Sequence, residues 1–86
     1  MPKQGDLVVV YNIGKSESLA VWGTWEGPEE LLGNYWPKII GRFYKNDVAI
    51  LLEIYSPTKG SIGAKICTEK NVIGWVSIKH LRSIAV

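Results

Sequence analysis

Two apolar stretches near the middle of the chain alternate with a period of two on either side of a turn signal. Residues 39–45 and 48–55 flank Asn46 and Asp47, whose side chains tolerate the positive φ that tight hairpin turns require. Residues two apart on a strand point to the same face, so each stretch would turn one face toward a core. The pattern predicts a β-hairpin over residues 39–55.

Three further short runs predict strands with turns between them. Residues 7–13 are mostly apolar or β-branched, and residues 62–68 and 72–77 are separated by a polar turn. Five short strands of this kind predict an all-β domain, either a small barrel or a sandwich. The core is expected to contain Val9, Ile39 or Ile40, Phe43, Ile50, Leu52, Ile66 and Val76. The apolar side chains expected to point outward are Val8, Val10, Leu51 and Tyr55.

Residues 14–37 do not follow this succession of short strands and turns. Residues 19–25 favour a short hairpin arm, and residues 27–33 have the proline, the two acids and the closing glycine of a single helical turn. We therefore expect a long insertion between the first and second strands. Long structured loops are uncommon in compact domains and often carry function, so this segment is the first place to look for a site.

Two segments of the chain resemble a known family. Residues 43–47 are similar to the turn and strand entry of SH3 and bacterial SH3-like domains, and residues 74–81 are similar to their closing Gly-aromatic-apolar segment, 3₁₀ turn and last strand. The resemblance implies a small five-stranded antiparallel SH3-like barrel, with residues 14–37 as a Trp-rich insertion. It also implies that Tyr11 stands where the family has an aromatic residue of its peptide groove.

Composition places this fold in one domain and outside the membrane. An 86-residue chain that is 47% hydrophobic can form one core without disulfides, so a single domain over residues 1–86 is expected. Cys67 is the only cysteine, which excludes an intramolecular disulfide and favours the cytoplasm. The four apolar residues after Asp6 are too few for a signal peptide or a membrane span.

The sequence offers little material for catalysis. His80 is the only histidine, and the chain has no Gly-rich phosphate loop, no metal-ligand spacing and no Gly-x-Ser-x-Gly turn. We therefore expect a protein that is not an enzyme, with no catalytic, metal-ligating or cofactor-binding residues and no cofactor. The opening Gly5-Asp6 and the apolar run after it are similar to the start of toxin-type ribonucleases with an SH3-like barrel. A degenerate ribonuclease barrel is therefore the second alternative.

Aromatic residues give the positive indication of function. Trp22, Trp25, Tyr35 and Trp36 fall within fifteen residues, and residues 16–37 carry four glutamates and no Lys or Arg. These rings either pack over the outer face of the sheet or anchor a protein partner, since Trp and Tyr dominate interface hot spots. We predict an accessory or regulatory protein-interaction module. The residues expected to bind the partner are Tyr11, Trp22, Trp25, Glu26, Tyr35, Trp36 and Trp75.

Two other kinds of partner follow from charge and from surface apolarity. Residues 38–86 hold eight basic and three acidic side chains, so the first alternative is a small barrel that binds nucleic acid. The net charge of +2 argues against tight binding to phosphates. The outward apolar residues also predict a homodimer with Trp22 or Trp25 in its interface.

Overall fold

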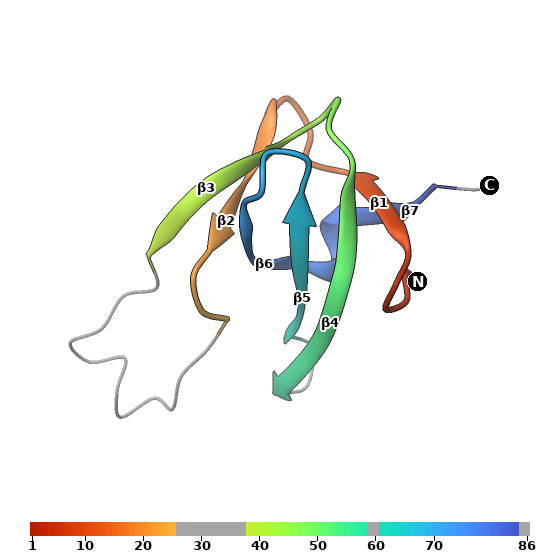
Figure 1. Cartoon of the computed structure of the whole chain (residues 1–86), viewed down its shortest axis with the longest axis vertical. Coiled ribbons are helices and arrows are strands. Elements are labelled where there is room, and N and C mark those ends of the chain that lie inside the picture. Colours follow the sequence, from red (N-terminus) through yellow and green to blue (C-terminus); the bar gives the residue numbers. More distant parts are fainter. Residues whose placement is uncertain (26–37, 59–60, 85–86) are drawn as a thin grey trace.

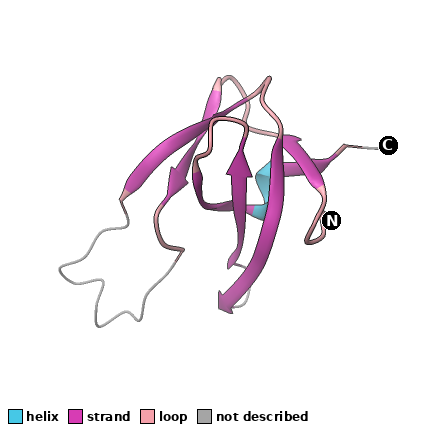
Figure 2. Ribbon diagram, viewed as in Figure 1, coloured by secondary structure: helices cyan, strands magenta, loops and turns pink. Residues whose placement is uncertain are grey.

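The computed structural model describes residues 1–25, 38–58 and 61–84, and Figure 1 shows their arrangement. Within these ranges the chain forms strands joined by turns and one 3₁₀ turn, as Figure 2 shows. The elements are β1 (Leu7–Val10), β2 (Ser18–Trp22), β3 (Ile39–Tyr44), β4 (Ala49–Thr58), β5 (Ser61–Thr68), β6 (Ile73–Ser77), η1 (Ile78–His80) and β7 (Leu81–Ser83). The predicted all-β class is confirmed.

All of these strands lie in one antiparallel sheet with the order β3-β2-β6-β5-β4-β1-β7. In the described part of the chain β3 and β7 are the two edges, and they lie on opposite sides of Figure 1. The sheet is not closed into a barrel. The prediction of five strands is wrong in number, because β2 and β7 join the five that the apolar runs indicated.

The predicted hairpin over residues 39–55 is also wrong, although both of its strands exist. β3 pairs with β2, and β4 pairs with β5 and β1. Asn46 and Asp47 do not adopt positive φ, so the chain turns a corner there instead of folding β4 back onto β3. A tight hairpin lies two connections later, between β5 and β6, where Asn71 has a φ of 63° and the amide of Thr68 donates to the carbonyl of Val72 at 3.0 Å.

Residues 18–22 were expected within the long insertion but form strand β2 inside the sheet. β2 pairs with β3 on one side and with β6 on the other. That part of the predicted insertion is therefore an integral strand of the sheet. Its residue Val21 is fully buried. The predicted helical turn over residues 27–33 lies outside the described residues.

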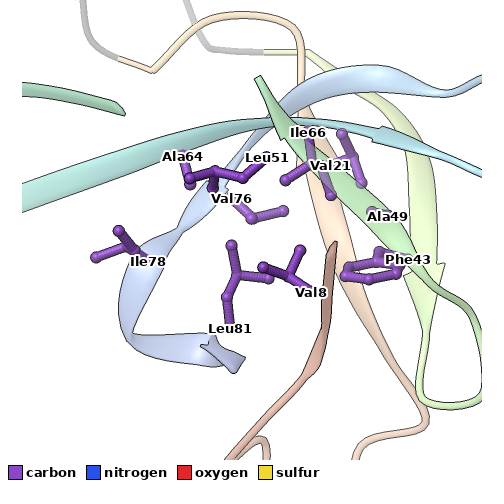
Figure 3. Packing of buried hydrophobic residues seen from close by; sticks show 10 residues of the cluster. All are labelled: Val8, Val21, Phe43, Ala49, Leu51, Ala64, Ile66, Val76, Ile78 and Leu81. Carbon is purple, nitrogen blue, oxygen red and sulfur yellow. The ribbon is translucent and has the colours of Figure 1, made fainter. Parts of the chain in front are cut away.

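One hydrophobic core fills the inner face of the sheet, as Figure 3 shows. Its members come from both ends of the strand order, so the sheet must curl around a single interior. The buried apolar residues are Val8, Val21, Phe43, Ala49, Leu51, Ala64, Ile66, Val76, Ile78 and Leu81. The predicted core positions Phe43, Ile66 and Val76 are confirmed.

The other predicted core residues do not lie in the core. Val8 and Leu51, expected to point outward, are fully buried, while Ile50 is 45% exposed. β4 is apolar on both faces, so its sequence does not show which face turns inward. The predicted core residues that are exposed or only partly buried are Val9, Ile39, Ile40, Ile50 and Leu52.

A β-bulge in β4 then reverses which face its residues occupy. Leu51 lies opposite Ile66 and Glu53 lies opposite Lys65, so Leu52 is an extra residue without an opposite partner. Beyond it, Ile54 lies opposite the buried Ala64. Residue 55 is thereby turned to the outer face, which positions the site described below.

A carboxylate ties the start of β1 to the last strand. Oδ2 of Asp6 accepts hydrogen bonds from the amide of Lys3 at 2.9 Å and from the hydroxyl of Ser83 at 2.8 Å. The pKa of Asp6 lies below its usual range, first because the Lys3 amide stabilises the ionised form and second because the Ser83 hydroxyl does. Asp6 therefore stabilises the fold in its charged state.

This arrangement predicts how stability depends on pH. A carboxylate whose pKa falls on folding adds stability above its unfolded pKa of about 3.9, and that stability is lost as the pH falls through the lower folded pKa. We expect Asp6→Asn to lower the melting temperature at about pH 7 and to differ less from the wild type below about pH 4. Circular dichroism melts across this range measure it. A difference that stays constant down to about pH 2.5 would show that the charge of Asp6 does not contribute.

Candidate functional site: an aromatic cluster on the outer face

The outer face of the central strands carries large side chains instead of small polar ones. On β5 the residues Ala64 and Ile66 are buried, so the alternating residues Gly63, Lys65 and Cys67 face outward. On β6 the same alternation turns Trp75 outward, and Trp75 lies directly opposite Lys65. The middle of this face is therefore a tryptophan beside a lysine.

A second tryptophan lies across the junction between β2 and β6. Trp22 is the residue of β2 that pairs with Trp75. The two strands approach closely because Gly74 has no side chain: a Cβ there would lie 2.6 Å from the carbonyl oxygen of Trp22. The glycine before Trp75 thus allows the two tryptophans to share one face.

Two further rings come from the turn after β2 and from β4. Trp25 lies against the backbone of Gly63, where a Cβ would overlap with its indole ring. Tyr55 lies opposite Gly63 on β4, and its ring centroid is 6.0 Å from that of Trp75 at an interplanar angle of 59°. This separation and tilt are in the range of favourable aromatic pairs. Because Gly63 has no side chain, the ring of Trp25 can pack against its backbone, next to the strand that carries Tyr55.

We call Trp22, Trp25, Tyr55 and Trp75 the aromatic cluster. The three tryptophans are partly buried and Tyr55 is 45% exposed, so each ring presents some of its surface to solvent. The indole N–H of Trp25 is enclosed and has no hydrogen-bond acceptor within the described ranges. Packing against Gly63, and not a hydrogen bond, therefore holds this ring in place.

Few charged side chains lie beside the aromatic cluster. Lys65 is partly buried between Trp75 on β6 and Glu53 on β4, which are its two direct neighbours across the strands. No carboxylate of the described residues lies within 4 Å of its ammonium. The cluster therefore combines aromatic surface with one lysine that a partner's carboxylate could reach.

The outer face continues from the cluster as an apolar row. Leu7, Ile50, Cys67 and Ile73 are successive direct neighbours across β1, β4, β5 and β6. A surface hollow of about 330 Å³ lies at the Leu7 end of this row. Rings and aliphatic side chains thus share one continuous face.

The predicted site residues have different outcomes. Trp22, Trp25 and Trp75 are brought together as the cluster. Tyr11 is elsewhere: its amide donates to the carbonyl of His80 at 2.7 Å, and the guanidinium of Arg82 lies 5.7 Å from its ring centroid. Glu26, Tyr35 and Trp36 lie outside the described residues. Tyr55 was expected to point outward, which is confirmed, but it was not predicted as a partner-binding residue. The bulge that gives it this orientation has no signal in the sequence.

The polar side chains considered for chemistry have structural contacts. A ring nitrogen of His80 lies 3.2 Å from the carbonyl oxygen of Asn12, and the Sγ of Cys67 lies 3.7 Å from the carbonyl oxygen of Thr68. Over residues 1–25, 38–58 and 61–84, no three His, Cys, Asp or Glu side chains gather as metal ligands would. Over the same ranges no helix reaches the length and apolarity needed to cross a bilayer.

Comparison with known proteins gives no relative for this chain. No protein-family model matches it, and neither the curated proteins nor the solved structures contain a match.

Proposed function

We propose that this chain is a non-enzymatic protein-interaction module that binds a protein partner with the aromatic cluster. One observation carries the proposal: four large rings from separate elements converge on the outer face, although the core on the inner face is complete without them. Partly exposed Trp and Tyr rings are typical of interface hot spots. Large contiguous exposed apolar patches are rare on monomers that have no partner.

The chemistry of the cluster indicates what the partner offers. Aliphatic or aromatic side chains would fill the space between the rings, and a carboxylate would pair with Lys65, whose neighbours desolvate it in part. The predicted homodimer through Trp22 or Trp25 would use the same surface. We also propose a relationship to SH3-like domains, supported by the succession of β6, η1 and β7 and by the pairing of β7 with β1. The single cysteine supports the cytoplasm as its location.

Selection of ligands from a random peptide library tests the proposal. We expect peptides that bind the wild-type chain to lose about tenfold or more in affinity for Tyr55→Ala and for Trp75→Ala, because truncating a hot-spot ring removes more than about 1.4 kcal/mol. Calorimetry of each purified variant measures the affinity, and thermal melts confirm that the variant is folded.

Tyr11→Ala is the matched control, because Tyr11 is 48% exposed but lies at the β1–β7 end of the sheet. Its affinity for the same peptides should not change. Equal losses in Tyr11→Ala and Tyr55→Ala would overturn the proposal. Sub-micromolar binding of an oligonucleotide at about 150 mM salt would favour the nucleic-acid alternative instead.

A further inference from the structure

The edge strand β3 presents backbone groups that no strand of the described chain pairs with. β3 has six residues, Ile39–Tyr44, and among the described strands it pairs with β2 alone. The opposite edge strand, β7, has three residues. A short edge gives little room for another strand to pair, whereas a longer one is a ready template.

The register shows which amides point away from the sheet. The amide of Lys45 donates to the carbonyl of Glu17 at 3.0 Å, so Lys45 faces β2. Facing residues of an antiparallel pair alternate between hydrogen-bonded and non-bonded pairs. The backbone of Phe43 therefore also faces β2, while the N–H and C=O groups of Arg42 and Tyr44 face outward.

This edge carries charge of one sign. Lys38, Arg42 and Lys45 are exposed, and residues 38–45 contain no acidic side chain. The guanidinium of Arg42 is fixed because its Nε donates to the hydroxyl of Ser18 at 2.7 Å and its Nη2 to the carbonyl of Ser18 at 3.3 Å. Such a fixed guanidinium can offer its remaining N–H groups to a carboxylate.

The two faces beside the edge differ in character. Arg42 and Tyr44 pair with Ala20 and Ser18, so they lie on the outer face, whereas Phe43 is buried on the inner face. A Cβ on Gly74, which is buried, would lie 2.8 Å from the Cδ1 of Ile40, so Ile40 also reaches the inner side. Lys45 has the phase of Phe43, and its ammonium donates to the carbonyl of Gly14 at 3.3 Å, so Arg42 supplies the charge beside Tyr44. A strand added at this edge would place alternate residues beside Arg42 and beside the apolar Phe43 and Ile40.

We propose that β3 binds an extended protein segment in which acidic and aliphatic residues alternate. Outward backbone groups supply the hydrogen bonds of an added strand, and side chains on the two faces select its sequence. A second copy of this chain is disfavoured, because pairing β3 with itself in an antiparallel register would bring the cations of two copies together. This inference concerns a different surface from the aromatic cluster, so each can fail without the other.

Amide hydrogen exchange with a synthetic peptide tests it. The probe is a peptide of alternating Glu and Val with blocked ends, and it is compared with a peptide of alternating Lys and Val. In the free chain we expect the amides of Arg42 and Tyr44 to exchange quickly and that of Phe43 slowly. A saturating amount of the Glu-Val peptide should slow Arg42 and Tyr44 by about tenfold or more, because their amides become ladder donors.

Charge reversal gives the matched pair of variants. Arg42→Glu should weaken the Glu-Val peptide by about tenfold, as expected for the loss of a charge-assisted contact, and should favour the Lys-Val peptide. Arg82→Glu makes the same change on β7 and should leave both affinities unchanged. The proposal is overturned if neither peptide binds, if both bind equally, or if the two edge amides are already protected in the free chain. Protection that rises with protein concentration would identify a second copy as the occupant and would also overturn it.

Discussion

Replacing Phe43 with alanine is expected to lower the free energy of unfolding by about 3–5 kcal/mol, the usual effect of removing a buried aromatic ring. Phe43 is fully buried and is among the largest side chains in the core. A domain of 86 residues has a total stability on the order of 4–13 kcal/mol. This single change therefore removes a large share of the stability, and urea unfolding followed by tryptophan fluorescence measures it.

The neighbouring Tyr44 provides the control for this experiment. It lies on the same strand but points to the outer face and is 43% exposed. Tyr44→Ala should change the stability by less than about 1 kcal/mol, as exposed substitutions usually do. If the two alanine variants lost the same free energy of unfolding, Phe43 would not be the residue that β3 buries in the core.

Replacing Gly74 with alanine is expected to have the second largest effect, a loss of about 2–3 kcal/mol typical of severe overpacking. The added Cβ would lie 2.6 Å from the carbonyl oxygen of Trp22 and 2.7 Å from Cγ1 of Val21. The first contact is with backbone, which cannot move without disturbing the pairing of β2 with β6. Chemical unfolding gives the stability, and the fluorescence of the paired tryptophans reports the local displacement.

Gly23→Ala is the matched control for Gly74→Ala. A Cβ at Gly23 would lie 3.4 Å from Cγ2 of Ile40 and 3.6 Å from the carbonyl oxygen of Lys38, which is ordinary packing. Its stability should stay within about 1 kcal/mol of the wild type. Equal losses in both glycine variants would mean that the close contacts of a Cβ at position 74 do not explain the result there.

Sequence patterns located the strands better than they located the strand partners. The apolar runs at residues 39–45, 62–68 and 72–77 coincide with β3, β5 and β6 within a residue or two. The hairpin between β3 and β4 was predicted from residue types that tolerate positive φ, but tolerance does not force that conformation. Strand pairing depends on the turn geometry that is adopted, and side-chain preference alone does not determine it.

The candidate site was predicted only in part, and the reason for the failure is similar. Clustering along the sequence was enough to single out Trp22 and Trp25, and Trp75 came from the Gly-aromatic segment. Tyr55 reaches the cluster because the register of β4 shifts at Leu52, and residue types alone do not show where such a shift occurs. Burial on β4 was predicted with the wrong phase because that strand is apolar on both faces.

The bulge at Leu52 also bears on how the gene for this chain can vary. A missense change at this codon alters one side chain on a residue that has no partner opposite it. Deletion of the same codon would remove the extra residue and leave Ile54 opposite Ala64 and Tyr55 opposite Gly63, so that both keep their faces. A change in the length of this strand should therefore be tolerated more readily at Leu52 than at Ile54 or Tyr55, which have partners on β5.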